Sequence, residues 1–382
     1  MVEPEVATQI IDTVRRFVER EVKPNAARYE HADEYPTPLV ERMKELGLFG
    51  ATIPAEYGGL GLDYSTYAQV VEEICRGWMS LSGVLNTHLM FANVLLAHGT
   101  TAQKDRYLGP MARGEDRVGF CLTEAHAGSD TQAIRTVARR DGDHYVVNGA
   151  KMFITNAETA TLFSLVAKTD PQATPRHTGI SLFAAEKGPG LTVGRHIKKL
   201  GYRGIETCEV VFENYRIPAD RLIGGIEGRG LKMALSGLEV GRINIAARAV
   251  GVAQAAFEDA IRYAQERQTF GKPICEHQAI QIKLADMGTK IEAARLLVRQ
   301  AAAMKDRGQR CDLEAGMAKL FASETAQEVA LEAMRVLGGY GFTQEFNVER
   351  YYRDTPLMLI GEGTNEIQRQ VIARGLVQRY KV

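Results

Sequence analysis

Residues 136–156 read TVARRDGDHYVVNGAKMFITN and contain two turn signals between β-prone runs. Asp141-Gly142 and Asn148-Gly149 both tolerate the positive φ that a tight hairpin turn requires. We therefore expect two hairpins in this stretch. Further short strands are expected at 162–167, 180–185, 191–193 and 208–212. Together these runs predict a β domain over residues 118–227, built as a sandwich or a barrel.

Helical patterns lie on both sides of this β domain. Near the start, Val6, Ile10, Val14, Val18 and Val22 recur every four residues, with Phe17 on the same stripe, which predicts an amphipathic helix that ends at Pro24. Further helical patterns are expected at 38–48 and within 65–113. Long proline-poor helices are expected at 231–265, 278–307, 313–337 and 365–378.

This order predicts an α+β multidomain chain with three parts. They are an N-terminal helical domain at 1–117, a middle β barrel or sandwich at 118–227, and a C-terminal four-helix bundle at 228–382. The order differs from the alternating strand and helix pattern of a doubly wound nucleotide-binding fold. The sequence also lacks G-x-G-x-x-G, a Walker A loop, H-E-x-x-H and G-x-S-x-G, which excludes the usual NAD, P-loop, zincin and α/β-hydrolase interpretations.

Composition narrows the possible partners. The 47 basic and 47 acidic residues balance, so no nucleic-acid partner is expected. No apolar run is long enough to predict a membrane span, because the nearest one, 81–96, is interrupted by Asn86, His88 and Asn93. The acidic start resembles neither a signal nor a transit peptide, so we expect a cytoplasmic protein. The five cysteines are scattered and odd in number, which predicts reduced thiols and no zinc site.

Four segments carry the chemical signal. They are GFCLTEAHAGSD at 119–130, KMFITN at 151–156, ERQTFGKP at 266–273 with HQ at 277–278, and RVLGGYGF at 335–342 followed by IGEGTNEI at 360–367. Each alone has a simpler interpretation, such as a turn, an amphipathic strand, a cation at a helix end or an exposed loop glutamate. Taken together and in this order, they resemble the acyl-CoA dehydrogenase family. The resemblance extends from about Val14 to Arg379.

The resemblance implies FAD as the cofactor and assigns residues to it. The implied FAD contacts are Phe120, Leu122, Thr123, Gly128, Ser129, Phe153, Ile154, Thr155, Arg267, Thr269, Phe270, Gln278, Arg335, Val336, Gly338, Gly339, Thr364 and Glu366. In the family, the arginine and the Gly-Gly loop reach the FAD of a neighbouring subunit. This implies a homo-oligomer, typically a tetramer built as a dimer of dimers. The implied substrate contacts are Ser129, Glu239, Arg242, Gly361 and Gly363.

The resemblance also implies a reaction, the α,β-dehydrogenation of an acyl-CoA to the trans-2-enoyl-CoA. Glu362 would remove the α-proton, and the flavin would accept the β-hydride and pass electrons to an electron-transfer flavoprotein. An α-proton is only weakly acidic, so the developing enolate needs stabilisation. In the family this comes from the backbone N–H of the catalytic glutamate and from a ribityl hydroxyl of FAD. Two alternatives stay open: an acyl-CoA oxidase that uses oxygen, or a catalytically silent binding protein on the same fold.

Several positions depart from the family pattern. Some branches place the base just before Arg242, but Gly241 stands there, which leaves the role to Glu362. Arg242 itself either contacts CoA or serves in helix packing or an ion pair. Gly361 stands where many relatives have tyrosine, which suggests room for branched or cyclic acyl groups. Ala125 replaces a common proline, and His126 is either a contact for a CoA phosphate or a solvated loop residue.

Overall fold

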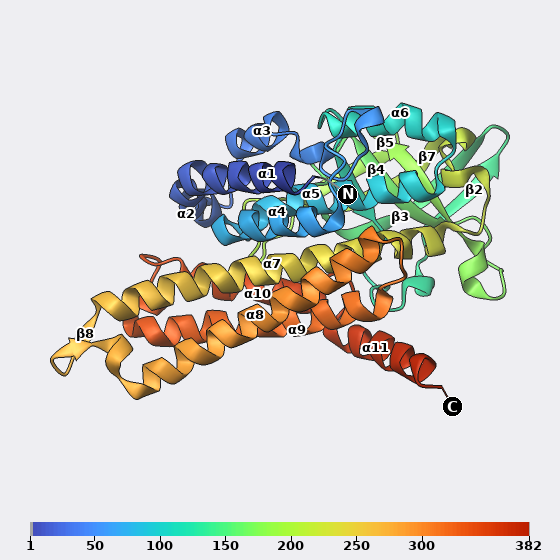
Figure 1. Ribbon diagram of the computed structural model, residues 1–382. Helices are drawn as coiled ribbons and strands as arrows, with labels where there is room; N and C mark the ends of the chain where they lie inside the picture. Colours follow the sequence, from blue (N-terminus) through green and yellow to red (C-terminus); the bar gives the residue numbers. More distant parts are fainter. Residues whose placement is uncertain (1–2, 382) are drawn as a thin grey trace.

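The computed structural model describes residues 3–381 and shows helical regions before and after one curled sheet (Figure 1). The N-terminal helices and the sheet lie side by side, and the long C-terminal helices run along both (Figure 1). The N-terminal elements are α1 Pro4–Phe17, a π-helical turn Val18–Val22, α2 Lys23–Ala32, α3 Thr37–Glu45, α4 Tyr64–Gly77, α5 Met79–His98 and α6 Thr101–Ala112.

The expected end of the first helix at Pro24 is wrong. The chain stays helical through Pro24 because the π-helical turn precedes it, where the N–H of Lys23 bonds the carbonyl of Val18, five residues back. Pro24 then stands at the start of α2, a position where a missing N–H costs little. The helix ends instead at Asp33, which adopts a left-handed conformation with φ of 52°.

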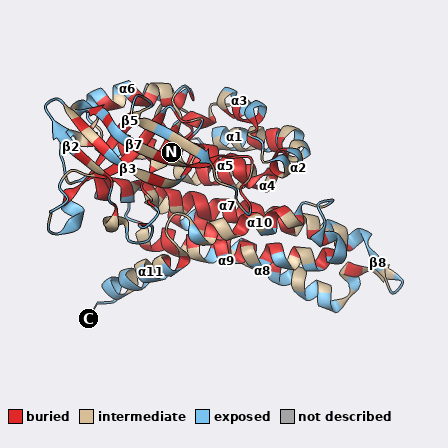
Figure 2. Ribbon diagram, turned by 180° about the vertical axis from the view of Figure 1, so that it is seen from behind, coloured by how far each residue is buried: buried red, intermediate tan, exposed pale blue. Residues whose placement is uncertain are grey.

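Helix α5 forms the centre of the core. Its side chains are buried along nearly its whole length (Figure 2), against α4, α6, α7 and β1. By length and composition it is the one described helix that could cross a membrane, with a mean hydropathy of 1.3 over its most apolar 18 residues. From the sequence, no segment was expected to be long and apolar enough to span a membrane. However, 83% of that stretch is buried inside the protein, and this burial accounts for its apolar composition.

The seven strands of the middle region form one sheet. They are β1 Val118–Cys121, β2 Val137–Asp141, β3 His144–Thr155, β4 Leu162–Lys168, β5 Ile180–Glu186, β6 Leu191–His196 and β7 Thr207–Pro218. Their order is β1-β4-β2-β3-β7-β6, with β5 paired to β4. The hairpin at Asp141-Gly142 is confirmed, since Asp141 pairs with His144 and Gly142 has φ of 63°.

The second expected hairpin, at Asn148-Gly149, is wrong. Strand β3 continues through this dipeptide, and its register with β7 shifts between Val147 and Gly149, as at a bulge. A Cβ at Gly149 would lie 2.5 Å from the hydroxyl oxygen of Thr136, and the residue has φ of 147°. Glycine is needed here for a close backbone approach, not for a turn.

The C-terminal region is a helical bundle. Its elements are α7 Gly230–Glu266, the short strands β8 Gln268–Thr269 and β9 Lys272–Pro273, α8 Gln278–Asp306, α9 Asp312–Leu337, α10 Val348–Ile360 and α11 Asn365–Arg379. Helix α10 was not among the expected helices, and Pro356 lies inside it. It packs against both α7 and α9, whereas α11 packs mainly on α9 and leads away from the bundle (Figure 1).

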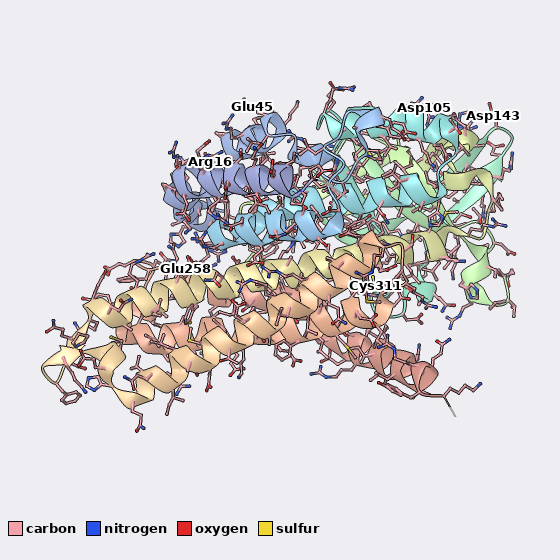
Figure 3. The ribbon with its side chains drawn as sticks, viewed as in Figure 1. Arg16, Glu45, Asp105, Asp143, Glu258 and Cys311 are labelled. Atoms are coloured by element: carbon pink, nitrogen blue, oxygen red, sulfur yellow. The ribbon has the colours of Figure 1, made fainter. Side chains whose placement is uncertain are left out.

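Helix α7 joins the bundle to the rest of the chain. It contacts α4 and α5 on one side and α8, α9 and α10 on the other. The ion pair between Arg76 of α4 and Glu258 of α7, 2.8 Å apart, bridges this seam; Glu258 is labelled in Figure 3. Segments from all three regions therefore meet around the middle of α7, where the candidate site lies.

Candidate active site

Glu362 lies in the short connection between α10 and α11. Its φ is 58°, in the left-handed region that a residue with a side chain seldom adopts, and Gly363 follows at φ of 87°. Thr364 then caps α11, because its hydroxyl accepts a hydrogen bond from the N–H of Ile367 at 3.3 Å. Threonine is a favoured residue at this position, because its hydroxyl satisfies a backbone N–H of the first helical turn. A strained backbone of this kind persists only when surrounding contacts hold it.

Those contacts come from two side chains that the sequence did not single out. Lys319 of α9 is fully buried, and its Nζ donates hydrogen bonds to the carbonyl oxygens of Leu359 at 3.2 Å and Gly363 at 3.0 Å. The Nε2 of Gln368 donates to the carbonyl oxygens of Glu362 at 3.3 Å and Gly363 at 3.1 Å. Burial lowers the pKa of the Lys319 ammonium to about 8. Both residues therefore fix the loop that carries Glu362.

The Glu362 carboxylate points toward α5 and α7. Its Oε1 accepts a hydrogen bond from Nδ2 of Asn86 at 2.7 Å. Its Oε2 is shielded from solvent and has no hydrogen-bond partner among the described residues. A Cβ built on Gly241 would lie 2.2 Å from this Oε2, so the glycine provides the space that the carboxylate occupies. The base position expected at Glu362 and the vacated one at Gly241 are thus neighbours in space.

Burial raises the pKa of the Glu362 carboxyl. Two effects lower this pKa in part: the hydrogen bond from Asn86, and the positive charges of Arg248, Arg242 and Lys319. A carboxylate with a raised pKa and one solvent-shielded oxygen free of partners can accept a proton. The backbone N–H of Glu362 donates no hydrogen bond within residues 3–381, so it is available to a ligand as well. The two groups together suit proton removal from a carbon beside a carbonyl.

The expected flavin-facing residues gather around β1 and β3. Phe153 is 61% exposed and has φ of 61°, beside a register shift in β3, so its ring lies on the surface of the sheet. The loop after β1 is tied to this strand, because the N–H of Met152 bonds the carbonyl of Thr123 at 2.8 Å. Of the other expected residues here, Phe120, Thr123 and Thr155 are partly exposed, Gly128 and Ser129 are exposed, and Leu122 and Ile154 are buried.

An ion pair buried beneath this loop holds it to β3. The Nζ of Lys151 lies 2.7 Å from Oε1 of Glu124, with side-chain exposures of 0% and 2%. Lys151 also donates to the carbonyl of Leu122 at 3.1 Å, and Glu124 accepts from the hydroxyl of Thr136 at 2.7 Å. Because the pair lies under the flavin-facing surface, its integrity determines the shape of that surface.

Breaking this pair should destabilise the protein strongly. Lys151→Met leaves the Glu124 carboxylate buried without its cation, and we expect the free energy of unfolding to fall by about 3–5 kcal/mol. Glu124→Gln added to Lys151→Met removes the uncompensated charge and should restore part of this loss. Urea unfolding of the three proteins measures both effects. A loss below about 1 kcal/mol in the single variant would show that the pair is not buried as described.

The second expected cofactor set lies at the far end of the bundle. A cavity of about 690 Å³ there is lined by Arg267, Thr269, Val336, Gly338 and Gly339, all of them expected. Three further expected residues, Phe270, Gln278 and Arg335, do not line it. Its other lining residues, which the sequence did not predict, include Tyr263, Ile274, His277, Ile280, Leu337, Tyr340 and Thr343.

The chemistry of this cavity suits a phosphorylated ligand. No carboxylate within residues 3–381 pairs with Arg267, which leaves its guanidinium available to an anion. A Cβ added at Gly338 or Gly339 would meet no atom within 4 Å, so the chain is open to a ligand at this loop. Phe270, at the tip of the β8–β9 turn, is 97% exposed.

The two expected cofactor sets lie far apart in one chain. The turn at β8, which carries Thr269, and the strands β2 and β3 stand at opposite ends of the molecule (Figure 1).

The remaining expected substrate contacts lie on α7 near Glu362. Arg242 forms no ion pair with any described residue, and its Nε is buried without a partner. Glu239 accepts a hydrogen bond from Sγ of Cys311 at 2.9 Å and lies 3.5 Å from Nζ of Lys305. Cys311, labelled in Figure 3, stands at the bundle end nearer the sheet. All five cysteines are free, as expected.

Three further positions complete the placement. Gly361 has a conventional φ of −66°, and a Cβ built on it would meet the Leu357 carbonyl oxygen at 3.2 Å. Glu366 is exposed in the first turn of α11. His126 lies 3.4 Å from Oε2 of Glu124, at the rim of the flavin-facing loop.

Comparison with known proteins agrees with this arrangement. The sequence model described as "Acyl-CoA dehydrogenase, N-terminal domain" matches residues 4–115, "Acyl-CoA dehydrogenase, middle domain" matches 119–215, and "Acyl-CoA dehydrogenase, C-terminal domain" matches 228–377. The chain is 43% identical over 366 residues to an "Acyl-CoA dehydrogenase" of Bacillus subtilis, covering 95% of this chain and 96% of that protein.

Two further similarities cover nearly all of the chain. It is 42% identical to "Short-chain specific acyl-CoA dehydrogenase, mitochondrial" of Bos taurus over 99% of its length and 92% of that protein. A solved structure described as "Electron transferring flavoprotein of Acidaminococcus fermentans: Towards a mechanism of flavin-based electron bifurcation" has a TM-score of 0.95 and 39% identity, with 99% of both chains covered. With the α–β–α fold and the Glu362 site in place, the chain belongs to the acyl-CoA dehydrogenase family, whose members are FAD-dependent oxidoreductases.

Proposed function

We propose that this protein dehydrogenates a short acyl-CoA thioester between its α and β carbons. The observation that carries the proposal is the carboxylate of the half-buried Glu362, whose Oε2 is shielded from solvent, has no hydrogen-bond partner among the described residues and faces the space left by Gly241. Oε2 accepts the α-proton, and the free N–H of Glu362 donates a hydrogen bond to the thioester oxygen as negative charge develops there. The similarity to a protein named short-chain specific supports a short acyl group.

The residues around β1 and β3 and at the bundle end fit FAD. Phe153 offers a flat apolar face, and Thr123 and Thr155 offer hydroxyls at its edge. Arg267 and the open loop at Gly338 and Gly339 suit a diphosphate. When bound, FAD supplies the acceptor for the β-hydride. The role of the protein is to align the thioester with that acceptor and to exclude water.

The opposite placement of the two sets supports a shared site. We propose that the bundle end of one subunit completes the FAD site of another, in a homotetramer arranged as a dimer of dimers (Figure 1). We further propose an electron-transfer flavoprotein as the electron acceptor. The description of a similar solved structure names such a flavoprotein, which supports this proposal. The domain boundaries at 117/118 and 227/228 and a cytoplasmic location stay proposals; the five free cysteines fit a reducing compartment.

Anaerobic bleaching of the bound flavin tests the proposed function. Saturated butyryl-CoA should reduce the flavin stoichiometrically, and the trans-2-enoyl-CoA should appear in the same amount. Reduced enzyme exposed to oxygen should reoxidise slowly, whereas an acyl-CoA oxidase would consume oxygen rapidly during turnover. If no saturated acyl-CoA bleaches the flavin, the dehydrogenase proposal is wrong and the chain is a binding protein on this fold.

The raised pKa of Glu362 predicts a pH dependence. Only the ionised carboxylate accepts a proton, so kcat/KM should be low in acid and should rise with pH through the pKa of Glu362. The midpoint of this limb should lie above 4.5, the ordinary value, because burial raises the pKa more than Asn86, Arg248, Arg242 and Lys319 lower it. A pH profile of kcat/KM at saturating electron acceptor measures it. A limb at or below 4.5 would contradict the assignment.

A further inference from the structure

A buried arginine without an anionic partner lies beside the Glu362 site. Arg248 of α7 is 2% exposed. Its Nε donates to Oδ1 of Asn244 at 2.6 Å, and its Nη2 donates to the carbonyl oxygen of Ser82 at 3.2 Å. The ring of Tyr202 lies 5.9 Å from the guanidinium carbon. Within residues 3–381, no carboxylate forms an ion pair with Arg248.

The Glu362 carboxyl lies within electrostatic reach of Arg248 without pairing with it, and the tyrosines and the cysteine around Arg248 stay neutral. Nδ2 of Asn244 donates to the hydroxyl of Tyr67 at 2.7 Å, so that hydroxyl is part of the same network. Burial raises the pKa of the Tyr67 and Tyr202 hydroxyls, and raises that of the Cys75 thiol to about 12. No negative charge is available from these side chains at neutral pH. Burial works against the Arg248 cation, although its polar neighbours leave its pKa raised, and an anion that joined it would offset the cost of burial.

Arg248 also opposes the action of the base. Its positive charge lowers the pKa of the Glu362 carboxyl, after the larger effects of burial and of Asn86. A weaker base removes an α-proton less readily. A permanent cation placed here for the sake of Glu362 alone would therefore work against the reaction. This conflict disappears if a substrate anion neutralises Arg248 when the site is filled.

The position of Arg248 on α7 sets the size of that substrate. Arg248 follows Gly241 by seven residues, so the two lie on the same face of the helix, about 10 Å apart along its axis. Helical side chains lean toward the N-terminus, which brings the guanidinium back toward Gly241 and Glu362. One short acyl chain therefore spans the distance between an α-carbon at Glu362 and the guanidinium.

We propose that Arg248 binds a carboxylate at the distal end of the acyl group, so that the substrate is the CoA thioester of a short dicarboxylic acid with about four or five carbons. The inference rests on the proposed function and specifies its substrate class. Arg248 is a specificity-determining residue that forms a charge-assisted hydrogen bond with the substrate. Asn244 and the Ser82 carbonyl hold its guanidinium in place.

Matched thioesters test this inference. Glutaryl-CoA and valeryl-CoA have the same number of acyl carbons and differ in a terminal carboxylate against a methyl group; succinyl-CoA and butyryl-CoA form a second pair. We expect the kcat/KM of the wild-type enzyme to be at least 100-fold higher for one or both dicarboxylic members than for their partners. Arg248→Gln should abolish this preference by lowering kcat/KM for the dicarboxylic thioester at least 100-fold, with valeryl-CoA changed less than threefold.

Binding and stability provide readouts independent of turnover. On holoenzyme with chemically reduced flavin, calorimetry should give weaker binding of glutaryl-CoA to Arg248→Gln, by at least tenfold, and unchanged binding of valeryl-CoA. Arg262→Gln, on an exposed part of the same helix, is the matched control and should leave both unchanged. The melting temperature of Arg248→Gln should equal or exceed that of the wild type, because an unpaired buried charge is removed.

The outcomes separate this inference from the proposed function. One outcome overturns only the inference about Arg248. In it, unbranched acyl-CoAs bleach the flavin, the wild type has a higher kcat/KM for valeryl-CoA than for glutaryl-CoA, and Arg248→Gln leaves the ratio of the two kcat/KM values unchanged. The inference is also overturned if Arg248→Gln melts more than about 5 °C lower with selectivity unchanged, since the arginine is then structural. If no thioester bleaches the flavin, the proposed function fails, and equal binding of glutaryl-CoA to wild type and variant overturns the inference separately.

Discussion

Glu362→Gln is expected to lower kcat by about 10⁴-fold with little change in the binding of acyl-CoA. The amide keeps the size of the side chain and can still accept the hydrogen bond from Asn86, whose Nδ2 lies 2.7 Å from Oε1. It cannot accept the α-proton, because its remaining atom is an NH₂ group where Oε2 now lies. Steady-state assays with an artificial electron acceptor, together with equilibrium binding of the enoyl product, separate the two effects.

The same substitution should stabilise the fold at neutral pH. Because burial raises the folded-state pKa of Glu362 above its unfolded value, the folded protein holds a proton over a pH range in which the unfolded chain has released it. The free energy of unfolding therefore falls as the pH rises through this range. Above the folded-state pKa, the full loss of stability caused by the ionised carboxylate is present. Glu362→Gln removes this loss, so its melting temperature should exceed that of the wild type at pH 7 but not at pH 4. A variant that keeps a tenth of the activity, or melts lower at pH 7, would contradict the role of a buried base.

Gly241→Ala is expected to lower kcat by about 10²-fold or more, although it adds a single methyl group far from any cofactor residue in the sequence. The added Cβ would lie 2.2 Å from Oε2 and 2.7 Å from Cδ of Glu362, and 3.0 Å from Sδ of Met90. These contacts are too short, so the carboxylate must move from the position in which it meets the α-carbon. Single-turnover flavin reduction measures the loss in the chemical step.

A glycine elsewhere in the bundle gives the matched control. A Cβ at Gly288 of α8 would meet Phe257 no closer than 3.7 Å, an ordinary contact. Gly288→Ala should therefore keep full activity and gain about 1 kcal/mol of stability from its higher helix propensity. If Gly241→Ala turned over at the wild-type rate, the carboxylate of Glu362 would not act from the space beside Gly241.

The sequence was sufficient to predict the layout of the chain, and it singled out Glu362 as the candidate base. Periodicity and turn residues placed the sheet between two helical regions. The residues around Glu362 and those around Gly338 could be recognised because each set lies within a few consecutive positions of the sequence. Errors came at two positions where a rule about glycine or proline did not hold. Gly149 serves a close approach to Thr136 rather than a turn, and Pro24 follows a π-helical turn that accommodates it.

The surroundings of the base could not be predicted in this way. Asn86 and Glu362 are 276 residues apart, and Lys319 reaches the loop of Glu362 from another helix. Such contacts depend on how helices pack, which no short motif encodes. A signal existed for Asn86, Lys319 and Arg248, because each interrupts a run of small and apolar residues in a segment expected to be helical. Without the fold, a charge of that kind cannot be told from an exposed one.

The central claim is that Glu362 alone removes the α-proton, and isotope exchange isolates that step. 3-Thiabutyryl-CoA has α-hydrogens but sulfur in place of the β-carbon, so proton removal can occur without hydride transfer. When the holoenzyme is incubated with this thioester in D₂O, the α-hydrogens should exchange for deuterium, and mass spectrometry measures the exchange. Glu362→Gln should show no exchange above the enzyme-free rate. Exchange by the Gln variant at a rate near that of the wild type would contradict the account.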